Sequence, residues 1–166
     1  MNIVYATDDN GALNLPPGVH ADIYIMTGGL SGDNTARFHS LQQGYNLHLH
    51  FIDMKDKYTD FPVGSKWSEA TYYRLGLAGE LPATVERALY VDIDTIFNRD
   101  ISPMYESEFG DCLIAGVFTT EDLSEESFSR WKREMNLDRS SIYINAGVIL
   151  YHIGRIREEC FESQVL

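Results

Sequence analysis

Two aspartates, one residue apart, directly follow a short apolar segment. The segment Ala88–Val91 has the composition of a buried strand, and Asp92 and Asp94 come after it. Open α/β sheets bind ligands at the carboxyl ends of their strands, and residues two apart on an extended chain point the same way. We therefore expect both carboxylates to bind one hard divalent cation, Mn²⁺ or Mg²⁺. An acidic turn at a strand end is the structural alternative for this triplet.

Three other segments carry polar residues where a ligand site would use them. Residues 7–10 follow an apolar run, Thr71 and Arg74 lie on a predicted helix, and residues 145–147 interrupt a long apolar stretch. Each has a structural alternative: an ordinary turn, a solvated helix face, or a bulge within a strand. Their combination with the aspartates favours a ligand site.

The elements that would position these residues alternate along the chain. Strands are predicted over residues 2–6, 22–26, 46–54, 88–91, 112–118 and 141–152. Helices are predicted from Ser31 or Asp33 to about residue 43, from Ser68 to a break at Gly79 and Pro82, over residues 127–134, and from about Arg155. Strands that alternate with helices indicate one α/β domain with a mainly parallel sheet.

Composition narrows the range of partners and compartments. A net charge of −12 over 166 residues argues against nucleic acid or an anionic membrane as the main partner. No apolar run approaches the roughly 20 residues of a transmembrane helix. The opening residues lack a basic segment, so we expect no signal peptide and a cytoplasmic protein. Cys112 lies in an apolar segment, which predicts a buried free thiol.

Four segments, in this order, resemble family 8 glycosyltransferases, the group that contains bacterial lipopolysaccharide galactosyl- and glucosyltransferases and glycogenin. They are Ile3–Asn10, Thr71–Leu75, Leu89–Asp94 and Tyr143–Val148. The resemblance implies a three-layer α/β/α sandwich of the glycosyltransferase A type. Residues 1–166 would be the N-terminal part of the family's nucleotide-sugar-binding domain.

The resemblance also implies a function. A retaining hexosyltransferase moves glucose or galactose from UDP-glucose or UDP-galactose to a carbohydrate acceptor, here lipopolysaccharide or another cell-surface glycan. The protein would be cytoplasmic, either free or peripheral at the inner face of the membrane. Asp92 and Asp94, the family's DXD motif, would hold the manganese or magnesium ion. The implied nucleotide-sugar site is Ala6, Thr7, Asp8, Asn10, Thr71, Arg74, Asp92, Ile93, Asp94, Asn145 and Ala146.

Individual roles follow from the same resemblance. Asp8 would accept a hydrogen bond from the uracil imide N–H, Arg74 would contact the donor's sugar or diphosphate, and Asn145 with Ala146 would line the hexose pocket. No strictly catalytic residue is assigned.

The sequence departs from the family pattern in two places. Gly11 stands where the family usually has an aromatic residue, and residues 11–20 are too short and proline-rich for the helix expected there. The chain ends at Leu166, before the family's later histidine ligand and its glycine- and lysine-bearing loop.

Three alternatives stay open at this point. The first is a non-catalytic remnant that binds a nucleotide sugar. The second is a phosphatase of the haloacid-dehalogenase type, because residues 92–96 also resemble its nucleophile motif. The third concerns His48 and His50, which share a strand face, although exposed strand positions explain this pair more simply than a metal site.

Overall fold

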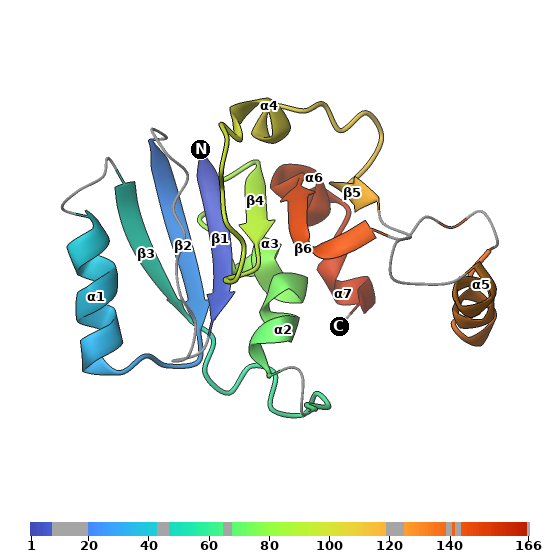
Figure 1. The fold of residues 1–166 in the computed structure, drawn as a ribbon, viewed down its shortest axis with the longest axis horizontal. Coiled ribbons are helices and arrows are strands. Elements are labelled where there is room, and N and C mark those ends of the chain that lie inside the picture. Colours follow the sequence, from blue (N-terminus) through green and yellow to red (C-terminus); the bar gives the residue numbers. More distant parts are fainter. Residues whose placement is uncertain are drawn as a thin grey trace.

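One six-stranded mixed sheet forms the centre of the protein. The computed structural model describes residues 1–7, 20–42, 47–64, 68–118, 125–138, 141 and 144–165. Across the sheet the strand order is β3-β2-β1-β4-β6-β5 (Figure 1). The strands are β1 (Asn2–Thr7), β2 (Ala21–Thr27), β3 (Leu47–Asp53), β4 (Ala88–Val91), β5 (Ile114–Phe118) and β6 (Ile144–Tyr151).

The first four strands confirm the predicted parallel sheet. β1 pairs in parallel with both β2 and β4, and β2 pairs in parallel with β3. β6 runs antiparallel to β4 and to β5, so the sheet is parallel on one side and antiparallel on the other. The carboxyl ends of β1 and β4 therefore meet at one edge, beside the amino-terminal half of β6.

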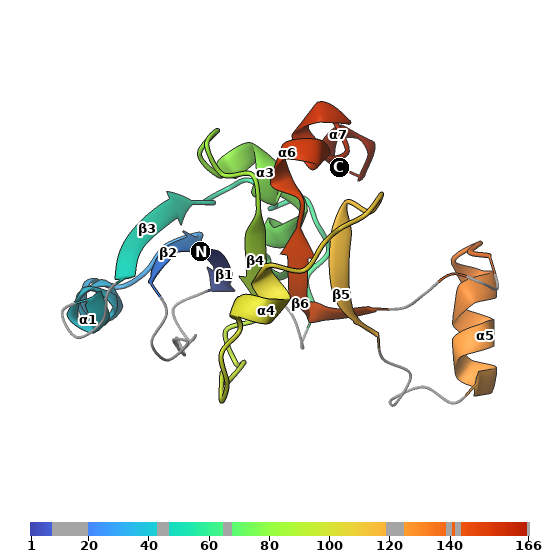
Figure 2. The ribbon, with the colours of Figure 1, turned by 90° about the horizontal axis from the view of Figure 1, so that it is seen from above.

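Helices cover both faces of this sheet, which gives three layers (Figures 1 and 2). On one face lie α2 (Ala70–Tyr73), a 3₁₀ turn η1 (Arg74–Gly76), α3 (Leu77–Glu80), α6 (Ile153–Glu158) and α7 (Glu162–Val165). On the other lie α1 (Gly32–Gln42) and α4 (Ser102–Tyr105). α5 (Glu125–Glu134) lies beyond β5, apart from both helical layers (Figure 2).

Alternate residues of the central strands supply two hydrophobic cores. Val4 and Tyr90 pack with Leu77 and Ile153 on the face covered by α3 and α6. Their neighbours Ile3, Tyr5, Leu89 and Val91 pack on the opposite face, where Phe38 of α1 joins them. Because β1 and β4 are buried on both faces, the ends of these strands are rigidly placed supports for a ligand site.

The segment before β5 differs from its prediction. The strand begins at Ile114, and Cys112 is exposed instead of buried. Gly110 has a positive φ of 55°, and the Cys112 amide donates to the carbonyl of Phe109 at 3.0 Å. A turn at residues 110–111 thus precedes Cys112, and Leu113 lies in a bend, so the strand begins two residues later than the apolar pattern had predicted.

The helix expected from Ser68 is shorter and divided into three pieces. α2 begins at Ala70 after Glu69, without a side-chain cap. α3 includes Gly79 and ends at Glu80, between Gly79 and Pro82, where the break was predicted, and Leu81 is extended. The Glu162 carboxylate accepts the Gly79 amide at 3.0 Å. In the predicted strand 141–152, β6 is continuous from Ile144, but its pairing with β5 shifts register between Ile144 and Ile149, which is the irregularity allowed for residues 145–147.

The end of that strand also changes the place of His152. It lies after β6, where it caps α6, and its Nδ1 accepts the Arg155 amide at 3.3 Å. Ser31, in contrast, confirms its predicted place at the start of a helix, because its Oγ accepts the Asn34 amide at 3.3 Å.

In the described part of the chain, no helix has the length and apolar character required to cross a membrane.

Candidate functional site

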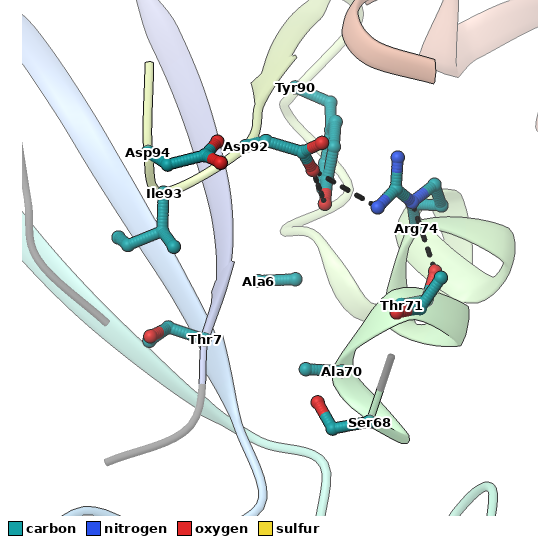
Figure 3. Close-up of a pocket in the computed structure, with 10 residues that line it drawn as sticks. All are labelled: Ala6, Thr7, Ser68, Ala70, Thr71, Arg74, Tyr90, Asp92, Ile93 and Asp94. Carbon is teal, nitrogen blue, oxygen red and sulfur yellow. Dashed lines mark hydrogen bonds and ion pairs between the residues drawn. The ribbon is translucent and has the colours of Figure 1, made fainter. Parts of the chain in front are cut away.

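A cavity of about 280 Å³ opens at the carboxyl ends of β1 and β4. Figure 3 shows that its walls come from these two strand ends and from the α2 segment. The lining residues are Ala6, Thr7, Ser68, Ala70, Thr71, Arg74, Tyr90, Asp92, Ile93 and Asp94. The place is the one at which open α/β sheets bind ligands.

The backbone at the end of β4 fixes the first aspartate. The Asp92 amide donates to the Gly147 carbonyl of β6 at 2.7 Å, and the Asp92 carbonyl accepts the Thr95 amide at 3.0 Å. The second bond closes a turn, so the chain between the two aspartates is not extended as the sequence had suggested. Asp94 nevertheless lines the same cavity as Asp92.

Arg74 joins three segments of the site. Its Nη2 donates to Asp92 Oδ1 at 3.0 Å, its Nε donates to the Thr71 carbonyl at 2.9 Å, and its Nη1 donates to the carbonyl of Ala146. The side chain is only 14% exposed. This places a permanent cation beside the Asp92 carboxylate, where it can also bind an anionic ligand.

Tyr90 lies beneath this ion pair. Its hydroxyl donates to Asp92 Oδ1 at 2.8 Å, and the Arg74 guanidinium carbon lies 4.5 Å from the centre of its ring. Burial raises the pKa of the Tyr90 hydroxyl well above its usual range, and Arg74 opposes this only in part. The hydroxyl therefore stays protonated and remains a hydrogen-bond donor.

A second cavity, of about 530 Å³, adjoins the first across the two aspartates. It is lined by Asp92, Asp94, Thr95, Val117, Phe118, Asn145, Gly147 and Val148. Within it, Asn145 Oδ1 accepts the Gly147 amide at 2.7 Å. The two carboxylates thus lie between the first cavity, beside Arg74, and the second cavity, beside β5 and β6.

Most of the predicted site residues that the structure describes come together here. Ala6, Thr7, Thr71, Arg74, Asp92, Ile93 and Asp94 line the first cavity. Asn145 lines the second, and Ala146 contributes its carbonyl oxygen to Arg74. Asp8 and Asn10 lie outside the described residues.

Several residues that contribute to the site were not predicted from the sequence. Ser68 and Ala70 line the first cavity, and Tyr90 both lines it and binds Asp92. The signal for Tyr90 was present, because a residue two positions before Asp92 on the same strand faces the same side. Gly147 had been included in the Tyr143–Val148 segment without a role of its own.

The carboxylates suit a hard divalent cation. Asp92 and Asp94 provide oxygen ligands of the kind that Mn²⁺ and Mg²⁺ prefer. No third histidine, cysteine or acidic side chain joins them within the part of the chain that the structure describes. His48 and His50 are exposed, as expected, and lie 3.5 Å and 2.9 Å from Asp22 Oδ1; they belong to no metal cluster among the described residues.

Comparison with known proteins agrees with this geometry. The family described as "Glycosyl transferase family 8" matches residues 4–166. The chain belongs to glycosyl transferase family 8. Among its relatives is the lipopolysaccharide 1,2-glucosyltransferase of Escherichia coli (strain K12), 32% identical over 132 residues, an alignment that covers 79% of this chain and 38% of that protein.

Two further family comparisons extend over nearly the whole chain. The lipopolysaccharide 1,3-galactosyltransferase of Salmonella typhimurium (strain LT2) is 26% identical over 168 residues, which are 92% of this chain and 48% of that enzyme. The crystal structure of galactosyltransferase LgtC in complex with donor and acceptor sugar analogs has a TM-score of 0.81 at 24% identity, and the match covers 95% of this chain and 60% of that one. This likeness confirms the expected glycosyltransferase A-type fold. The chain spans about two fifths to three fifths of the length of these three proteins.

Proposed function

We propose that this family 8 chain forms the donor site of a retaining hexosyltransferase. The donor is UDP-glucose or UDP-galactose, the acceptor is a carbohydrate of a lipopolysaccharide or another cell-surface glycan, and the site uses Mn²⁺ or Mg²⁺. The observation that carries this proposal is the pair Asp92 and Asp94, which lines one cavity with Arg74 at the carboxyl end of β4.

The layout of the two cavities supports a nucleotide sugar as the ligand. The first cavity lies beside Ala6 and Thr7, where family membership implies the nucleoside. The second includes Asn145, for which the resemblance implies the hexose. A diphosphate between them would lie at the two aspartates and near Arg74. The sugars named for the Escherichia coli and Salmonella relatives are the reason for glucose and galactose.

The residues of the chain then have separable tasks. Asp92 and Asp94 would hold the cation, which supplies Lewis-acid stabilisation of the departing nucleoside diphosphate. Arg74 would bind donor oxygens through its fork of N–H groups. Thr7, at the buried end of β1, would line the nucleoside side of the first cavity. We include retention of the anomeric configuration in the proposal because the resemblance to family 8 implies it.

One alternative retains physical support. A binding module that holds the donor without transferring the sugar would use the same two aspartates and Arg74. Membership of the glycosyltransferase family leaves the phosphatase interpretation without support.

Release of UDP from UDP-glucose and UDP-galactose, with water or the hydroxyl of an added sugar as the acceptor of the hexose, tests the proposal. We expect one of the two donors to release UDP with Mn²⁺, and we expect EDTA or Asp94→Asn to abolish the release. Asp111→Asn removes an equal charge from an exposed turn before β5 and should leave the rate unchanged. Donor binding without UDP release would favour the binding module, whereas the absence of donor binding would overturn both interpretations.

A further inference from the structure

The buried hydroxyl of Tyr90 has a specific task that its apolar surroundings do not explain. The side chain is 1% exposed within the core beneath α2 and α3. Its hydroxyl nevertheless reaches the cavity wall, where it donates to Asp92 Oδ1 at 2.8 Å (Figure 3). Phenylalanine would fill the same space, so the hydroxyl matters only for what it binds.

Two donors converge on the same carboxylate oxygen. Arg74 Nη2 lies 3.0 Å from Asp92 Oδ1, and its guanidinium group rests over the Tyr90 ring at 4.5 Å. Tyr90 thus binds Oδ1 directly and also supports the second donor. Oδ1 is held from the side of the helices, which leaves Oδ2 as the oxygen that is available to another ligand.

Gly147 of β6 leaves room for that second oxygen. A Cβ atom at this position would lie 2.8 Å from Asp92 Oδ2 and 3.0 Å from Asn145 Oδ1. Real Cβ atoms essentially never approach another heavy atom as closely as 2.8 Å. Oδ2 therefore lies over the glycine, at the boundary with the second cavity.

We propose that Tyr90 is a positioning residue for the cation site: its hydroxyl fixes Asp92 Oδ1 so that Oδ2 is presented to the divalent cation. The inference rests on the proposed function, since it requires a cation at Asp92 and Asp94. The Tyr90 hydroxyl is neutral, so it orients the carboxylate without cancelling its charge. Partners of this kind, which orient metal ligands, typically change metal affinity by about 10- to 100-fold when they are removed.

The decisive variant is Tyr90→Phe, which removes one oxygen atom. Its matched control is Tyr105→Phe, because the Tyr105 hydroxyl also makes partly buried hydrogen bonds at the opposite end of β1 and β4: it accepts the Asn2 amide and donates to the Arg87 carbonyl. Mn²⁺ binding is followed by the electron paramagnetic resonance signal of the free ion. Titration calorimetry with UDP then gives the Mn²⁺ concentration required for half-maximal nucleotide binding.

We expect Tyr90→Phe to weaken Mn²⁺ binding about tenfold and to raise that half-maximal concentration by a similar factor. Tyr105→Phe should leave both quantities unchanged, even if its melting temperature falls as much as that of Tyr90→Phe. Equal Mn²⁺ affinity in Tyr90→Phe and the unaltered protein would overturn the positioning role and leave the proposed function intact. If the unaltered protein fails to bind Mn²⁺, both are overturned.

Gly147→Ala tests the same arrangement from the other side. Its Cβ would displace Oδ2, so Mn²⁺ affinity should fall while Tyr90 remains in place. Gly32→Ala is the control, since a Cβ there meets no atom within 4 Å. Unchanged Mn²⁺ affinity in Gly147→Ala would contradict the assignment of Oδ2 as the metal-binding oxygen.

Discussion

Arg74 connects the segments that form the candidate site. Its guanidinium group connects the Thr71 carbonyl of α2, the Asp92 carboxylate after β4 and the Ala146 carbonyl of β6. A lysine in its place would have one ammonium group instead of a fork, so it would not reach Asp92 and Ala146 together in the same geometry. The arginine therefore both shapes the site and is available to an anionic donor.

Replacement of Arg74 by alanine should weaken UDP binding. A hydrogen bond to a charged group contributes about 1.5–3 kcal/mol, so in the presence of Mn²⁺ we expect the Kd for UDP to rise by about 10- to 100-fold. Titration calorimetry measures this change. Arg37→Ala provides the comparison, because Arg37 is an exposed residue of α1, and it should leave the Kd unchanged. An equal Kd for Arg74→Ala and the unaltered protein would remove Arg74 from the binding site.

At the scale of elements, Arg157 of α6 supports the chain that leads into β4. Its guanidinium group donates to the carbonyls of Ala78, Leu81, Pro82, Ala83 and Val85. Glu162 complements it, since its carboxylate accepts the amides of Ala78 and Gly79 in α3. These contacts hold the segment between α3 and β4 and thereby fix where the strand that carries Asp92 begins.

Loss of this support should destabilise the whole fold. We expect Arg157→Ala to lower the free energy of unfolding by about 2–4 kcal/mol, because several backbone carbonyls lose a charged donor. Urea unfolding measures the change. Arg155→Ala, on the same helix, removes an exposed ion pair with Glu159 at 2.7 Å and should cost less than about 1 kcal/mol. If the two variants were equally stable, the proposed support of the β4 segment would be wrong.

The elements that the sequence predicts well are those with a repeating apolar pattern. Ala88–Val91 was predicted with its observed limits, and the parallel core follows from strands buried on both faces. The turn at Cys112 and the division of the Ala70–Glu80 segment were not predicted. Both depend on contacts from distant residues or on backbone conformation, as Glu162 shows at Gly79.

The same distinction applies to the site. Asp92, Asp94 and Arg74 could be chosen from the sequence because their types and order resemble a known family. The hydrogen bond between Arg74 and Asp92 could not be predicted from the sequence, since the two residues meet only through the packing of α2 and η1 against β1 and β4. The role of Gly147 likewise requires knowledge of which strand lies beside β4.

At the scale of the molecule, buried tyrosines make the stability of the fold depend on pH in the alkaline range. Burial raises the pKa of Tyr151 to about 12, and it also raises the pKa values of Tyr5 and Tyr90 beyond their usual range. In the unfolded chain these hydroxyls lose their protons near pH 10. The unfolded state then binds fewer protons than the folded state, so stability is complete below pH 10 and falls as the pH rises through the folded values.

Unfolding by urea between pH 9 and 12 should show this loss. Each such tyrosine contributes a slope of up to about 1.4 kcal/mol per pH unit, so Tyr151→Phe should make the decline shallower by about that amount. Complete ionisation of all ten tyrosines near pH 10 in the still folded protein, followed at 295 nm, would contradict this account.

The central claim is that Asp92 and Asp94 form a metal-dependent site for a uridine diphosphate. Titration calorimetry of UDP against the protein, with and without Mn²⁺ and beside the double variant Asp92→Ala/Asp94→Ala, tests it most directly. We predict UDP binding that requires Mn²⁺ and is lost in the double variant. UDP binding of equal affinity in the double variant, or no binding to the unaltered protein with Mn²⁺, would contradict the claim.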